Sequence, residues 1–183
     1  MSTRLLGDSS LERLRALLLD EGGLMASLVD VSSSDGPTTR ASVASPAQLA
    51  AAGPRVDGRG ADYELLVETI YEGYLLHYHV PRVVRAPEKD LGLLAGDRLY
   101  ALGLARLVSL GDIEAVAELA DVITLSALSH GGANPELADA VWTAGARAVG
   151  WGASPQHERA KALVRAGSPD ALEAMRSLAA VEG

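Results

Sequence analysis

Residues 90–110 read Asp-Leu-Gly-Leu-Leu-Ala-Gly-Asp-Arg-Leu-Tyr-Ala-Leu-Gly-Leu-Ala-Arg-Leu-Val-Ser-Leu, and this stretch decides the fold class. Leucine, alanine and glycine recur on almost every side of the helix that it predicts. We therefore expect it to be the central and most buried helix of a bundle. One face carries glycines that let a neighbouring helix approach closely, namely Gly92, Gly96 and Gly103.

Helical patterns with capping residues lie on either side of this stretch. Asp62 can cap a helix that runs to about His79, and Asp112 can cap the helix that follows Gly111. Later helix starts combine a capping side chain with proline, at Asn134-Pro135, Ser154-Pro155 and Ser168-Pro169. Because no run of strand length alternates apolar and polar residues, we predict an all-α fold. The prediction is a compact bundle of about five to seven helices.

The helix after Asp112 is predicted to be strongly amphipathic. Its acidic residues Glu114, Glu118 and Asp121 lie opposite a long apolar stripe. That stripe consists of Ile113, Val116, Ala117, Ala120, Ile123, Ala127 and Leu128.

The first 60 residues have a different composition. Leucines at helical spacing predict a helix that ends at Gly22 and Gly23, and the segment 24–31 is too short to classify. Residues 32–60 are rich in serine, proline and glycine, with a short alanine-rich helix at 46–52. We predict two regions: a helix plus a flexible, low-complexity linker over 1–60, and a helical domain over 61–183.

Charge and apolar run length limit the partners. The formal net charge of the 183-residue chain is −8, which disfavours nucleic acid and anionic membranes as partners. The longest apolar stretch is interrupted by Asp97, Arg98 and Arg106, and the N-terminus has no signal-peptide core. The chain contains no cysteine. We expect a cytoplasmic protein with no membrane span.

Two carboxylates and an imidazole share one face of the helix predicted over 62–79. Glu68 and Glu72 are four residues apart, and His79 lies further along the same face. Such a set could hold a divalent metal or share a proton. The alternative is a solvated acidic stripe, which is common on helix surfaces. These three residues are weak metal candidates; no metal site and no cofactor is predicted.

Candidate ligand-binding residues gather around the end of this helix: His77, His79, Arg82, Arg85 and Asp97. His77 continues an apolar face and is expected to be buried and hydrogen-bonded. Asp97, on the central helix, is expected to form an ion pair with a neighbouring helix. The two arginines lie in a basic loop over 80–89 that could bind an anion. No nucleophile elbow or phosphate-binding loop is present, so no catalytic residue is predicted.

Two segments resemble the trans-isoprenyl diphosphate synthase family. Leu75-Leu76-His77 matches the segment that leads into the first aspartate-rich motif of that family. Arg82 and Arg85 fall where the loop arginines of the family lie, and Leu93 to Leu99 resembles the start of its next helix. The resemblance covers about residues 62–130 and implies a helical prenyl-synthase-like fold.

The same comparison implies that the chain is not a synthase. Tyr78 and His79 replace the paired aspartates, Pro81 interrupts the motif, and no Asp-Asp-x-x-Asp follows Gly132. The family uses those aspartates to hold the Mg²⁺ ions that bind diphosphate. The chain is more similar to the non-catalytic small subunit of two-component heptaprenyl diphosphate synthases.

This resemblance implies a catalytically silent protein that acts in isoprenoid biosynthesis. Its partner would be a catalytic prenyl synthase subunit, or a second copy in a homo-oligomer. The alternative is a helical domain of unrelated function that binds a protein or a small apolar ligand. An enzyme that uses Glu68, Glu72 and His79 with a metal is a third reading. An exposed apolar helix face would favour a partner, and an enclosed apolar cavity a ligand.

Overall fold

The computed structural model describes residues 2–30 and 44–179, and within these ranges it contains helices and one isolated β-bridge but no strand. The predicted all-α fold is confirmed. Residues 60–179 contain the six helices α4 to α9. The core of the predicted linker, residues 31–43, lies outside the described residues. No helix in the described part of the chain is both long and apolar enough to cross a bilayer.

The chain divides into two compact units. The first comprises residues 1–48 and 61–106, and the second comprises residues 49–60 and 107–183. This division differs from the predicted boundary near residue 60. The N-terminal helix does not stand apart, because its leucines supply part of the core of the first unit.

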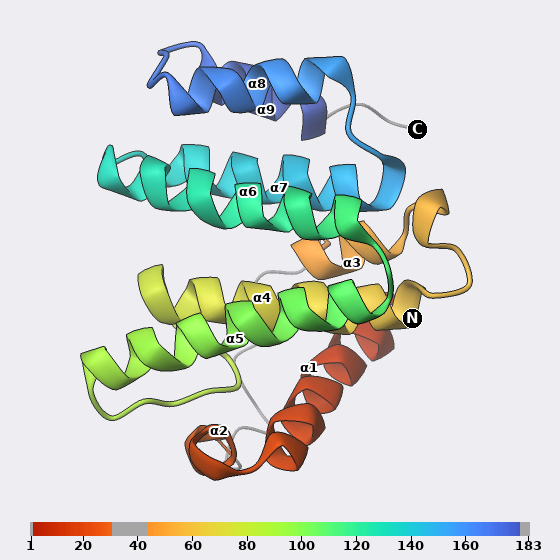
Figure 1. The fold of residues 1–183 in the computed structure, drawn as a ribbon, viewed down its shortest axis with the longest axis vertical. Helices are drawn as coiled ribbons and strands as arrows, with labels where there is room; N and C mark the ends of the chain where they lie inside the picture. Colours follow the sequence, from red (N-terminus) through yellow and green to blue (C-terminus); the bar gives the residue numbers. More distant parts are fainter. Residues whose placement is uncertain (1, 31–43, 180–183) are drawn as a thin grey trace. The chain divides into compact units, whose positions relative to one another are not determined.

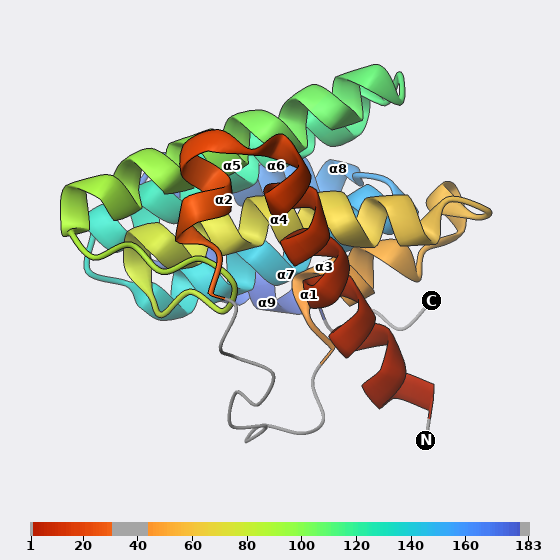
Figure 2. The same cartoon turned by 90° about the horizontal axis from the view of Figure 1, so that it is seen from below.

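The first unit is built on α4 (Gly60–Tyr78) and most of α5 (Lys89–Ser109), and α1 (Ser2–Glu21) and α2 (Gly23–Leu28) lie across this pair (Figure 2). Val29, just after α2, forms the bridge to Val84 in the loop between α4 and α5. The segment 24–31, which the sequence left unclassified, is thus a short helix followed by a bridge as far as it is described. The core of the first unit consists of Leu14, Leu17, Leu18, Met25, Leu28, Val29, Val83, Val84, Ala95, Leu99 and Leu102.

Glycines allow the close contact between α4 and α5. A Cβ atom added at Gly96 would lie 2.6 Å from the His77 ring, and one at Gly73 would lie 2.9 Å from the Gly96 carbonyl oxygen. An added Cβ at Gly103 would collide with the Ile70 side chain. The predicted close approach is therefore confirmed at Gly96 and Gly103. Gly92 has only ordinary van der Waals surroundings.

The prediction that residues 90–110 form the most buried helix is wrong. Leu94 of α5 is 64% exposed and Val108 is 51% exposed, whereas α4 buries most of its length, including Tyr63, Ile70 and Tyr74. As predicted, α5 is apolar on nearly every side. Burial, however, depends on which faces other helices cover, and the outer face of α5 is left open.

The second unit is a stack of two helical hairpins. Figure 1 shows α6 (Ile113–Gly131) and α7 (Pro135–Trp151) side by side, with α8 (Pro155–Arg165) and α9 (Ala171–Ala179) against them. The end of α3 (Pro46–Ala51) and the 3₁₀ turn η1 (54–56) complete the unit. Its largest fully buried side chains are Trp142, Leu107, Leu119, Leu125 and Met175.

Predicted caps begin the helices of this unit. The Asp112 carboxylate accepts a hydrogen bond from the Ala115 amide at 3.0 Å, and Asn134 and Ser154 cap α7 and α8 in the same way. Each cap satisfies a backbone N–H that the helix itself leaves unpaired.

The expected orientation of α6 is met at Glu114, which is exposed, but is wrong for Glu118 and for the apolar stripe. Glu118, placed on its polar face by the sequence, is buried, whereas Ile113 is 61% and Leu128 50% exposed. The reason is that α6 has a second apolar face, and that face packs in the core. It consists of Ala115, Leu119, Val122 and Leu125.

We expect Gly145→Val to destabilise the second unit by about 1–3 kcal/mol, since even a Cβ atom at Gly145 would collide with Val122 of α6. Gly131→Ala is the matched control, because an added Cβ there has nothing within 4 Å. Urea denaturation followed by circular dichroism measures both. Equal midpoints for the two variants would contradict close α6–α7 packing.

Candidate functional site

A row of three buried carboxylates runs along α4. Glu64, Glu68 and Glu72 are spaced four residues apart, and their residues are only 5%, 1% and 0% exposed. Ionised carboxylates at this depth require charged or hydrogen-bonding partners. The partners come from α1 and from the loop between α4 and α5.

Glu72 organises that loop through a single oxygen. Its Oε1 accepts hydrogen bonds from the backbone amides of Arg82 at 2.7 Å, Val83 at 2.6 Å and Val84 at 3.1 Å. Three consecutive amides therefore converge on one buried acceptor, which fixes the loop against α4.

Arg82 is the cation of the row. Its guanidinium pairs with Glu68, its Nε lies 3.4 Å from Glu72 Oε2, and it lies over the Tyr71 ring. Burial raises the pKa of Glu68, and the attraction of Arg82 offsets this only in part. At the start of the row, Arg13 Nη2 pairs with Glu64 at 3.0 Å.

The structure does not gather Glu68, Glu72 and His79 into a metal site. The two carboxylates face Arg82, while His79 Nε2 lies 3.0 Å from the hydroxyl of Tyr74. The alternative of a solvated acidic stripe is also wrong, because both glutamates are fully buried. Their shared helix face was predictable, but the arginine that covers it was not.

The remaining predicted ligand-binding residues also have partners within the chain. Arg85 pairs with Asp30 at the surface, whereas Arg82 is occupied by the row. Asp97 Oδ1 lies 3.2 Å from His77 Nε2, and this contact is an ion pair only when the imidazole is protonated. The expectation that His77 is buried and hydrogen-bonded is wrong, because His77 is half-buried and its Nε2 makes no hydrogen bond to any described residue. The His77 ring stacks on Tyr100, with 5.3 Å between ring centroids.

A second charged cluster lies in the second unit and was missed by the sequence analysis. Glu118 Oε1 of α6 lies 2.7 Å from His157 Nε2, Glu118 Oε2 accepts a hydrogen bond from Lys161 Nζ at 3.0 Å, and all three residues are buried. Lys161 also pairs with Asp121 at 2.8 Å and Glu158 at 2.7 Å. The only sign of this cluster in the sequence is that His157 and Lys161 are four residues apart on one predicted helix. Their acidic partner is 39 residues away from His157.

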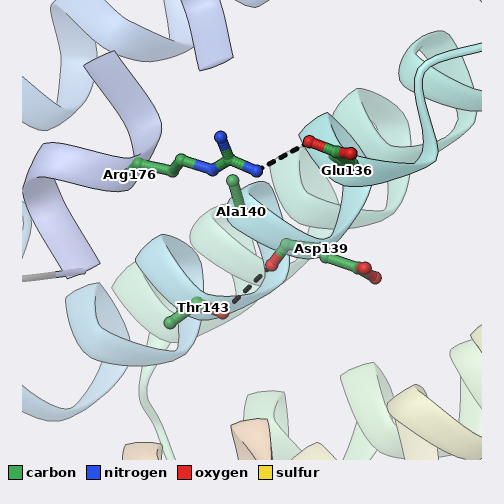
Figure 3. A pocket seen from close by; sticks show the side chains of 5 residues that line it. All are labelled: Glu136, Asp139, Ala140, Thr143 and Arg176. Carbon is green, nitrogen blue, oxygen red and sulfur yellow. Dashed lines mark hydrogen bonds and ion pairs between the residues drawn. The ribbon is translucent and has the colours of Figure 1, made fainter. Parts of the chain in front are cut away.

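This cluster borders a cleft of about 430 Å³. The charged residues lining it are Arg55, Glu114, Glu118, Asp121, Glu158 and Lys161. Arg55 Nη2 bonds to Asp112 at 2.7 Å and to Glu114 at 2.8 Å at one side of the cleft. A shallower hollow of about 250 Å³ between α7 and α9 is bordered by the exposed Arg176–Glu136 pair (Figure 3).

No protein-family model, curated protein or solved structure matches the chain.

Arg82→Met should destabilise the protein by about 3–5 kcal/mol, because it leaves Glu68 and Glu72 buried without their cation. Arg176→Met is the matched control, since Arg176 and its partner Glu136 are 53% and 69% exposed and such a surface pair is worth at most about 1 kcal/mol. Chemical denaturation of both variants at neutral pH measures the difference. Similar losses would contradict an internal role for Arg82.

Glu68→Gln should change how stability depends on pH. Because the folded-state pKa of Glu68 lies above its unfolded value, the folded protein holds a proton that the unfolded chain releases. The contribution of Glu68 to stability therefore falls as pH rises from the unfolded toward the folded pKa. Free energies of unfolding between pH 4.5 and 7 should show this fall as a difference between wild type and variant. Parallel profiles would contradict the raised pKa.

Proposed function

We propose that this chain is a catalytically silent helical subunit that acts by binding a partner. The proposed partner is a catalytic prenyl diphosphate synthase, and the face that binds it is the outer face of α6. The observation that carries the proposal is the uncharged, solvent-exposed stripe along that helix.

The residues around the end of α4 support the absence of synthase chemistry. Holding Mg²⁺ ions against a diphosphate requires several accessible oxygen ligands. Tyr78 and His79 occupy the positions that the family resemblance assigns to aspartates. The nearest carboxylate on α4, Glu72, accepts three backbone amides and is 0% exposed.

The outer face of α6 has the composition of a covered surface. Glu114 and Asp121 lie only at its edge, and its centre carries no charge along about four turns. Two branched side chains, Ile113 and Leu128, lie at its ends with small residues between them. Its exposed members are Ile113, Ala117, Ala120, Thr124, Ala127 and Leu128. A helix that is apolar on two faces and packed on only one favours a protein partner.

The first unit repeats this feature on a smaller scale. On α5, Leu94 and Ala101 are exposed seven residues apart, on the same side of the helix. This side is less uniform, because Arg98 lies beside it and is 56% exposed. The α6 face is therefore the better candidate for the principal contact.

The geometry gives less support to a small apolar ligand. The larger cleft described above is lined by six charged side chains, and the hollow between α7 and α9 is bordered by an exposed ion pair. Ligand pockets for apolar molecules are mostly apolar and enclosed.

Affinity purification from the native host tests the proposal, with Ala120→Arg as the disabling variant. Ala120 lies at the middle of the α6 face, so an arginine there should abolish recovery of the partner without affecting the fold. Ala162→Arg is the matched control, because Ala162 is an exposed alanine in helix α8. We expect the wild type and the control to recover a synthase that carries both aspartate-rich motifs.

Two outcomes would contradict this function. If only further copies of the chain are recovered, the outer face of α6 serves self-association and not a synthase. Recovery of the same synthase by Ala120→Arg as by the wild type would show that α6 does not provide the contact.

A further inference from the structure

We propose that Glu118, His157 and Glu158 form a binding site for a divalent transition-metal ion, with Zn²⁺ as the best match. The site lies within the second unit and is independent of the partner proposed above. It combines residues from α6 and α8.

The three side chains already lie within chelating distance of one another. One ligand atom from each, a carboxylate oxygen of Glu118 and of Glu158 and a ring nitrogen of His157, all lie within 4.8 Å of one another. Among the described residues, no other three histidine or carboxylate side chains are grouped this closely. One nitrogen and two oxygen ligands suit Zn²⁺, with a fourth position left for water.

Two of the three ligands are held in place before any ion binds. The side chains of His157 and Glu118 are 5% and 8% exposed, and His157 Nε2 lies 2.7 Å from Glu118 Oε1. His157 lies in the first turn of α8, whose start is fixed by the Ser154 cap on the His157 amide. Glu158 follows directly and is 56% exposed, so it can close on an ion from the solvent side. A rigid pair and an adaptable third ligand lower the ordering cost of binding.

The charge of the adjoining cleft favours a cation. Four carboxylates and two cationic side chains line it, and Arg165 also pairs with Asp121, so the carboxylates outnumber the neighbouring cations by one. Arg55 is already bonded to Asp112 and Glu114, and Lys161 to Glu118, Asp121 and Glu158, so neither is free to attract an anion. The cleft also gives solvent and ions access to Glu118 and Glu158.

Lys161 sets the limit on affinity. Its ammonium bonds to both glutamates of the site, so a bound metal ion would share these carboxylates with a neighbouring positive charge. The two carboxylate oxygens of Glu118 can serve the two cations separately, because Lys161 bonds to Oε2 and His157 faces Oε1. Replacing Lys161 by glutamine should therefore strengthen metal binding by removing the competing charge.

Isothermal titration calorimetry with Zn²⁺ on the full chain, purified without a polyhistidine tag, tests the site. We expect one Zn²⁺ per chain. We expect His157→Ala and Glu158→Gln each to weaken binding by about tenfold or more. Glu158 is exposed, so that variant keeps the test informative if His157→Ala fails to fold. His77→Ala, in the first unit, should leave the affinity unchanged.

Three results would overturn the proposal. The first is the absence of stoichiometric binding up to 100-fold excess Zn²⁺. The second is binding that persists unchanged in both His157→Ala and Glu158→Gln. The third is binding by Lys161→Gln alone, which would show that Lys161 is itself the cation that this cluster holds in the native protein.

Discussion

The first unit depends on the hydrogen bonds that one buried oxygen, Glu72 Oε1, accepts from three consecutive amides. They fix the loop after α4, and the loop in turn carries Val83 and Val84 into the core that α1 and α2 share. The Asp30 amide bonds to the Val83 carbonyl at 2.9 Å, and the Arg85 amide bonds to the Leu28 carbonyl at 2.8 Å. The same loop delivers Arg82 to Glu68 and Glu72. The loop that the carboxylates position thus supplies the cation that offsets the cost of their desolvation.

Both units bury charge in the same manner, but the consequences differ. The acidic row of α4 is enclosed and has its own cation, so it serves the fold. The Glu118 cluster adjoins an open cleft with excess negative charge, and one of its acidic members is exposed to solvent. Spacing along a helix is similar in both cases. What separates a structural network from a binding site is access for solvent and the balance of charge.

The sequence predicted the elements well because their ends depend on local chemistry. The caps at Asp112, Asn134 and Ser154 begin helices where expected, and the glycines at 96 and 103 mark where two helices meet. Burial could not be predicted in the same way. Glu118 looked like a surface residue because its cation lies 43 positions later, on a helix that packs against α6 only in the folded unit. Likewise α6 has two apolar faces, and the pattern alone does not say which of them the core uses.

We propose that the outer face of α6 is covered by another polypeptide in the cell. A photo-cross-linking amino acid at Thr124 tests it most directly, because Thr124 is exposed on that face. The same amino acid at Ala162 reports non-specific contacts. We expect irradiation in the native host to join position 124, but not position 162, to a prenyl synthase. Equal labelling at both positions, or none at 124, would contradict it.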